Sequence, residues 1–467
     1  MPQALKHFFR THIFIIPLLA GLAMPLFFLR FVNYEFNPAD VNDQGLHQRI
    51  AINLAHEGAF SGAAGPLKPF CPVRPPLYPL LLALIMKLSG SSWFFIVRAI
   101  QVLLHLSTIW LIGRIALLLY DGSRLAAFTA ALTAALIPHT ALIALDLMSE
   151  TLSIFLLVAS VFLVLRAASA PGYANHILLG ICAGLLILAR PVFMLLLPVL
   201  WAYLIIHSPA RKDALLKICL SAAAVIIMML PWMVSSSRVL HQVRAFQNTG
   251  VGFNLMGGIF RSYPFFARDM RSAAYEFGAD RAARELLIRT IKPDYLGLSP
   301  KDIDLSLPEV RRLIAVSFMI YADAWREEPP DPELVMNADL FLKKAAAVWI
   351  RSHPGEYLPV LIKNLDYLLL QRYQPDIYQD LMQRSFQVPD YIKYLLYALF
   401  LAGVISSKKK GRTAAAVLPL IVILYLVSIY LPMGNMPRYF FPAYPLMALM
   451  LPMLLLPAKP KELPHPL

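Results

Sequence analysis

The chain has 467 residues, of which 58% are hydrophobic and only 15% charged, whereas a soluble domain carries about 25% charged residues. Its 42 lysines and arginines against 28 aspartates and glutamates give a net charge of +14. Many of the basic residues lie in short loops, so membrane orientation and anionic lipids explain them better than nucleic acid does. The composition excludes a soluble protein, and we expect no nucleic-acid partner.

Blocks of apolar residues, such as Ile13–Leu29 and Ala414–Met433, approach the length of about 20 residues that crosses a bilayer as a helix. They predict an all-α polytopic membrane protein with roughly ten transmembrane helices. The predicted spans are residues 12–32, 93–119, 125–145, 151–168, 176–189, 191–207, 214–234, 391–405, 413–432 and 438–457. The first span follows Lys6 and Arg10, and its only small-residue triplet lies inside the apolar run, so we expect a retained anchor rather than a cleaved signal peptide.

The segment Leu77–Leu88 is apolar but too short to cross a membrane, and we predict an interfacial helix on the outer face. The basic residues of the short loops then fall on one side, as the positive-inside rule requires. In this topology both chain ends are cytoplasmic, and Arg190-Pro191 is an outward turn between two short spans.

This topology divides the chain into three parts. Residues 1–234 form an N-terminal transmembrane module with a first outer loop at 33–76. Residues 235–390 form a mostly helical extracytoplasmic region, and residues 391–467 form the last transmembrane helices and a short cytoplasmic tail. We find no internal repeat of the kind that marks a two-halved transporter.

Ionisable residues predicted at the outer face near a span are functional candidates, because charges at membrane depth usually face a cavity. They are Asp40, Asp43, Arg74, Asp146, Glu150, Arg190 and Arg438. A carboxylate can take a proton from a hydroxyl, and an arginine can bind a phosphate through two hydrogen bonds. The two kinds together, next to lipid, favour a reaction on a phosphate-bearing lipid.

Asp43 begins a stretch with its own pattern. Leu46, Ile50 and Leu54 recur every four residues up to Gly58, which predicts a short amphipathic helix lying on the membrane. Asp43 is its expected N-cap, and Gly58 stands near its end. A helix cap is therefore the structural alternative to a catalytic Asp43.

The other candidates have structural alternatives too. Arg74 precedes two prolines that fix the backbone, and it could be an interface anchor, as could Arg190 and Arg438. Glu150 begins a predicted span, where a carboxylate also favours the helix dipole. Asp40 is expected to be a loop charge.

Two other groups of residues are expected to be structural. The tyrosines near the last spans indicate an interfacial aromatic belt; they are Tyr425, Tyr430, Tyr439 and Tyr444. The three cysteines, and the separation of His47 from His56, do not match a metal site. We expect no cofactor.

Several motifs follow one another along the chain. They are Asp43-Gln-Gly-Leu-His-Gln-Arg, Arg74-Pro-Pro-Leu-Tyr, Met148-Ser149-Glu150, Ala189-Arg190-Pro191, Leu230-Pro231-Trp232 and Arg438-Tyr439-Phe440-Phe441-Pro442. Through them the chain resembles the multi-spanning GT-C glycosyltransferases, which include the protein O-mannosyltransferases and the bacterial lipid A aminoarabinose transferase. The resemblance covers most of residues 1–235 and 335–457. It departs from the family at His47, where an aromatic residue is usual, and over residues 240–335.

The resemblance implies an inverting transfer of a sugar from a polyprenyl-phosphate-linked donor to a lipid, glycan or protein acceptor of the cell envelope. Asp43 would be the catalytic base, and Glu150 a second acid that orients donor or acceptor. Arg74, with Arg190 or Arg438, would hold the leaving phosphate. The same resemblance implies a bacterial inner membrane, an active site facing outward and no nucleotide site.

Two other classes of function stay open. A polysaccharide polymerase or ligase shares lipid-linked substrates and outer-loop arginines, but it would not need the early acid and the Arg-Pro-Pro motif. A transporter of lipid-linked sugars is the other class, and the missing repeat argues against it.

Overall fold

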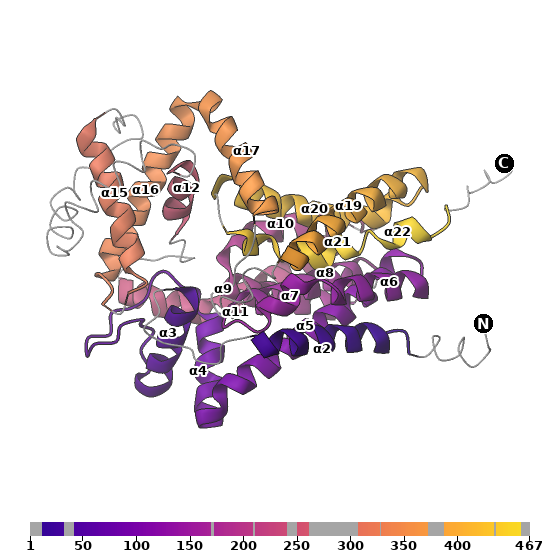
Figure 1. Ribbon diagram of the computed structural model, residues 1–467, viewed down its shortest axis with the longest axis horizontal. Coiled ribbons are helices and arrows are strands. Elements are labelled where there is room, and N and C mark those ends of the chain that lie inside the picture. The colour runs from indigo at the N-terminus through magenta and orange to yellow at the C-terminus, as the bar shows by residue number, and fades with distance from the viewer. Residues whose placement is uncertain are drawn as a thin grey trace.

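A computed structural model describes residues 12–31, 42–169, 172–208, 211–240, 250–260, 307–326, 328–371, 387–433 and 436–458. Every regular element in these ranges is a helix, which confirms the all-α class. Most helices run side by side in one bundle, and a second helical group stands at one end of it (Figure 1). The beginning of α2 (Ile15–Phe28) and α22 (Pro452–Leu455) lie at the opposite end (Figure 1), as expected if both chain ends are on one side of a membrane.

Long apolar helices make up the bundle. Besides α2 they are α5 (Trp93–Leu119), α6 (Arg124–Ala135), α8 (Glu150–Ser169), α9 (Ala174–Ala189), α10 (Leu196–Ile206), α11 (Arg211–Leu240), α19 (Gln387–Lys409) and α20 (Thr413–Tyr430). In the described part of the chain, four helical stretches are long and apolar enough to cross a membrane; they are Leu77–Leu119, Glu150–Ser169, Lys212–Val239 and Thr413–Met433. Apart from α19, which has 23 residues, the other apolar helices are shorter, so the number of spans stays a prediction.

Two of the predicted spans are not continuous helices. Residues 125–145 divide into α6 and α7 (Pro138–Ile143), and residues 438–457 divide into η6 (Pro437–Phe440), α21 (Ala443–Ala448) and α22. Proline lacks the backbone N–H and obstructs the preceding turn. Pro138 begins α7 and Pro452 begins α22, so the apolar run predicted the extent of these segments but not their breaks.

The chain turns sharply between α4 (Leu77–Ser89) and α5. Gly90 has a φ of +54° there, a conformation that glycine adopts readily. α4 runs steeply across the direction of the bundle helices (Figure 1). The turn separates Leu77–Leu88 from the direction of the following span, and the prediction that this segment is an interfacial helix on the outer face stays a prediction.

Helix α3 (Asp43–Glu57) corrects the sequence analysis at its start. The side chain of Asn42 accepts a hydrogen bond from the backbone N–H of Gly45 at 2.8 Å, so Asn42 is the N-cap and Asp43 is the first helical residue. The prediction that Asp43 caps the helix is wrong. Gly58, with a φ of +71°, ends the helix as predicted.

The apolar stripe of α3 also has a different partner from the one predicted. Leu46 and Ile50 are fully buried in one cluster with Val316 and Ile320. These partners belong to α15 (Pro308–Asp323). The stripe therefore faces protein and not lipid.

The second helical group consists of α12 (Val251–Phe260), α15, α16 (Pro332–Ser352) and α17 (Pro354–Leu370). Its core contains Met256, Ile314 and Leu342. Carbonyl groups at the end of α17 and just after it accept hydrogen bonds from α19. Lys393 Nζ donates to the carbonyl oxygen of Gln371, the residue that follows α17, at 3.0 Å, and the Tyr397 hydroxyl donates to that of Leu369 at 3.2 Å. These bonds attach the second helical group to the bundle.

Candidate active site

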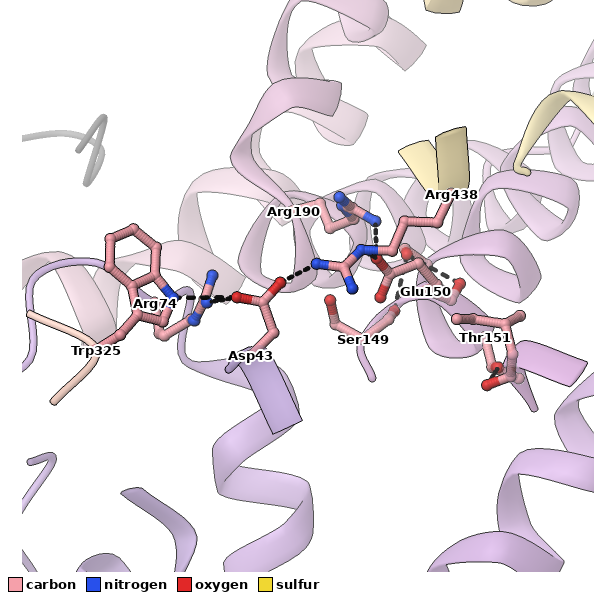
Figure 2. A network of polar contacts seen from close by, with 10 residues as sticks. Asp43, Arg74, Ser149, Glu150, Thr151, Arg190, Trp325 and Arg438 are labelled. Atoms are coloured by element: carbon pink, nitrogen blue, oxygen red, sulfur yellow. Dashed lines mark hydrogen bonds and ion pairs between the residues drawn. The ribbon is translucent and has the colours of Figure 1, made fainter. Parts of the chain in front are cut away.

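Two carboxylates and three arginines meet where α3 and the second helical group approach the bundle (Figure 2). They come from five separate places in the chain. Asp43 begins α3 and Glu150 begins α8, while Arg74 precedes α4, Arg190 follows α9 and Arg438 lies in η6. All five predicted site residues are thus in one network of contacts. Asp40 lies outside the described residues.

Asp43 is held by two arginines. Its Oδ1 accepts from Arg74 Nη2, and its Oδ2 accepts from Arg438 Nη2. Since Asn42 caps the helix, the Asp43 carboxylate is free to make these contacts. Its side chain is 18% exposed, so part of it can be reached from outside the protein.

Glu150 occupies the other side of the network. Its Oε1 lies 3.1 Å from Arg190 Nη1 and 3.3 Å from Arg438 Nε. The side chain is only 3% exposed. Arg438 therefore contacts both carboxylates, and three positive charges against two negative ones leave the network with a net positive charge.

The segment that carries Glu150 is fixed by polar groups of three helices. Gln101 Nε2 donates to the carbonyl oxygens of Ala144 and Asp146 at 2.9 and 2.7 Å, and Gln101 accepts from the Tyr78 hydroxyl at 2.6 Å. The backbone N–H of Leu147 donates to a side-chain oxygen of Gln44 in α3 at 3.4 Å. These bonds set the position of Glu150 relative to Asp43. The other predicted candidate, Asp146, is fully buried in this segment.

The charges of the network change the protonation of its neighbours. Burial would raise the pKa of Asp43, but the guanidinium groups of Arg74 and Arg438 outweigh it and hold the pKa of that carboxyl well below its usual range. His47 lies one turn further along α3 and is buried. Burial, assisted by Arg74, lowers the pKa of His47 to about 3, so its imidazole is neutral near pH 7.

Aromatic rings lie against both halves of the network. The sequence analysis missed Trp325 and assigned Tyr439 to an interfacial belt. The indole Nε1 of Trp325 donates to Asp43 Oδ1 at 3.1 Å, and the Arg74 guanidinium lies 5.3 Å from the centre of the same ring. The Arg190 guanidinium lies 4.7 Å from the ring centre of Tyr439, which stacks on Tyr430 at 5.4 Å. Tyr439 is thus part of the site.

The prediction that the tyrosines near the last spans form an interfacial belt is wrong for two of them. Tyr430 and Tyr444 are buried inside the protein, where neither ring reaches a membrane surface. No sequence signal separates these tyrosines from a belt, because both occur at the ends of apolar runs. Among the described residues, no three His, Cys, Asp or Glu side chains form a group that could hold a metal ion.

One family model matches part of the chain. A family model described as dolichyl-phosphate-mannose-protein mannosyltransferase matches residues 73–234. No curated protein sequence is significantly similar to the chain. Over these residues the match confirms the resemblance to the GT-C glycosyltransferases.

One of the solved structures that are similar to the chain has a TM-score above 0.5, which indicates a related fold. The oligosaccharyltransferase of Archaeoglobus fulgidus, tethered to an acceptor peptide, is similar with a TM-score of 0.51 and 13% identity over 96% of this chain and 50% of that one. The chain thus spans half the length of that enzyme. ArnT from Cupriavidus metallidurans, bound to undecaprenyl phosphate, has a TM-score of 0.39 and 14% identity over 97% of this chain and 78% of that one.

Proposed function

We propose that this protein is a glycosyltransferase that moves a sugar from a polyprenyl-phosphate-linked donor to an acceptor hydroxyl at the outer face of a membrane. The observation that carries the proposal is Arg438, which contacts the carboxylates of both Asp43 and Glu150. A base for the acceptor and cations for a phosphate are therefore neighbours at one end of an apolar bundle, where a lipid-linked phosphate can reach them.

The proposed reaction is a single displacement. Asp43 takes the proton of the acceptor hydroxyl, and the acceptor oxygen attacks the anomeric carbon of the sugar. The bond between that carbon and the phosphate oxygen breaks, and the configuration inverts. The departing polyprenyl phosphate gains negative charge, which Arg74 and Arg438 or Arg190 stabilise through charge-assisted hydrogen bonds.

Donor binding would also activate the base. Both oxygens of Asp43 accept hydrogen bonds from arginines, and a carboxylate paired in this way is a weak base. A donor phosphate competes for Arg74 and Arg438 and thereby releases the carboxylate. Glu150 keeps Arg190 and Arg438 in position during this exchange. The acceptor is then deprotonated only when a donor is present.

A reconstituted assay tests the proposal. The purified protein in liposomes is given a panel of radiolabelled polyprenyl-monophosphate sugars together with the glycolipids and glycans of cells that lack the gene. We expect one labelled product, release of polyprenyl monophosphate, and a product anomer opposite to that of the donor by NMR. Consumption of polyprenyl-diphosphate glycans alone would instead support a polymerase or ligase, and movement of the lipid without a product would support a transporter.

A further inference from the structure

Trp325 reaches the candidate site from the second helical group. It follows the end of α15, and its indole N–H donates to Asp43 Oδ1 at 3.1 Å (Figure 2). It lies within residues 240–335, where the family resemblance does not extend. The feature is therefore a property of this chain that the shared motifs do not account for.

The indole is fixed from two directions. Its ring lies against those of Tyr321 and Phe253, with centroid distances of 5.1 and 5.6 Å. Its backbone carbonyl accepts from Arg49 Nη2, and Arg49 Nε also donates to the carbonyl of Gly62 at 2.9 Å. Arg49 is a buried residue of α3, the helix that begins with Asp43. Both partners of the bond between Trp325 and Asp43 are thus tied to one helix.

The donors around Asp43 are unevenly divided between its two oxygens. Oδ1 accepts from Arg74 and from Trp325, whereas Oδ2 accepts from Arg438. An ionised carboxylate offers about four acceptor positions, roughly two on each oxygen. Both positions on Oδ1 are therefore occupied, whereas Oδ2 accepts a single hydrogen bond from the part of the chain that the structure describes.

The two kinds of donor respond differently to a phosphate. The guanidinium groups of Arg74 and Arg438 carry charge and are attracted to it, whereas the indole of Trp325 is neutral and is held by its ring contacts. After a donor has drawn the arginines away, Trp325 still occupies Oδ1. Oδ2 then has both of its acceptor positions free, whereas Oδ1 has only one.

We propose that Trp325 is a positioning residue that favours Oδ2 of Asp43 as the basic oxygen, so that the acceptor hydroxyl approaches between Asp43 and Glu150. This inference rests on the proposed function. In the step, the proton moves from the acceptor oxygen to Oδ2 while that oxygen bonds to the anomeric carbon. The bond between the anomeric carbon and the phosphate oxygen breaks, and the phosphate keeps the electron pair.

Replacing Trp325 with β-(3-benzothienyl)alanine tests this directly, because that residue keeps the bicyclic shape and has sulfur in place of the N–H. A hydrogen bond to a charged group corresponds to about a 10–100-fold effect. We expect kcat to fall by that factor, while the KM values for donor and acceptor stay within about threefold. Trp325→Phe should act in the same direction. The same analogue at Trp110, an exposed residue of α5, is the matched control and should leave the rate unchanged.

A wild-type kcat in the Trp325 analogue would overturn the inference and reduce this residue to packing. Asp43→Asn in the same assay separates the failure of the Trp325 inference from the failure of the proposed function. If Asp43→Asn is inactive and the analogue is fully active, only the role of Trp325 fails. If Asp43→Asn is fully active, the proposed base fails as well. The double variant Asp43→Asn/Trp325→Phe should be no slower than Asp43→Asn alone, since both residues act through one carboxylate.

Discussion

The two halves of the candidate site have similar contacts but different surroundings. In each half a carboxylate pairs with an arginine beside an aromatic ring: Asp43 with Arg74 and Trp325, and Glu150 with Arg190 and Tyr439. The Asp43 side chain is 18% exposed and is bordered by the second helical group, whereas that of Glu150 is 3% exposed and begins a bundle helix.

The difference in burial separates two tasks. An acceptor must approach from outside the bundle, so the half with the more accessible carboxylate suits the base. A buried ion cluster is costly to form and more costly to leave half-paired, so the Glu150 half suits the fixed positioning of Arg190 and Arg438. Variants of the two halves should therefore fail in different ways.

The largest effect is expected for Asp43→Asn. A positioned base contributes about 10²–10⁴ in rate, so transfer should fall by that factor. Protein level and melting temperature should stay close to wild type, because Asn42 and not Asp43 caps α3. Initial rates in liposomes and a melting curve measure both. Glu57→Gln, at the exposed far end of the same helix, is the control and should transfer normally.

Glu150→Gln should lower stability where Asp43→Asn does not. It leaves Arg190 and Arg438 without their buried carboxylate, and breaking a buried pair costs about 3–5 kcal/mol. We expect a clearly lower melting temperature in detergent and a smaller loss of transfer than for Asp43→Asn, compared at equal amounts of folded protein. Equal melting curves for the two variants would show that burial does not distinguish the halves.

Variants of Arg74 test whether donor binding needs the two parallel hydrogen bonds of a guanidinium or only a positive charge. Arg74→Ala removes a phosphate contact worth about 10–100-fold in binding, and we expect KM for the donor to rise by roughly that factor, with less change in KM for the acceptor. Arg74→Lys should recover part of it, because lysine keeps the charge but not the bidentate geometry. An unchanged donor KM in Arg74→Ala would make this residue a structural partner of Asp43 only.

The sequence predicted the features that depend on nearby residues better than the contacts between residues far apart in the chain. The helical class follows from local apolar runs. Charges near membrane depth and the ordered motifs indicate the five site residues, which are Asp43, Arg74, Glu150, Arg190 and Arg438. The roles of these residues stay predictions. Trp325 could not be found in this way, because its contact with Asp43 depends on how α15 packs on α3. The N-cap was missed by one residue, since Asn42 and Asp43 are about equally good caps.

His47 gives the smallest expected effect and the finest test of the Asp43 half. Its ring meets that of Tyr78 edge-on at 5.1 Å, a contact that a phenyl ring preserves, so His47→Phe should transfer within about threefold of wild type at pH 7.

The pH dependence of folding stability should show the effect of His47 instead. Its pKa is about 3 in the folded protein against 6.5 without the fold, so the unfolded chain binds the extra proton and folding weakens as pH falls below 6.5. Between pH 7 and pH 5 this linkage is worth roughly 2 kcal/mol. His47→Phe should remove that part of the acid sensitivity. Asp43 titrates below this window, and Asp339, whose pKa burial raises to about 6, contributes equally to both proteins. The difference between the two melting curves therefore isolates His47, and parallel curves would mean that the imidazole is not held neutral beside Arg74.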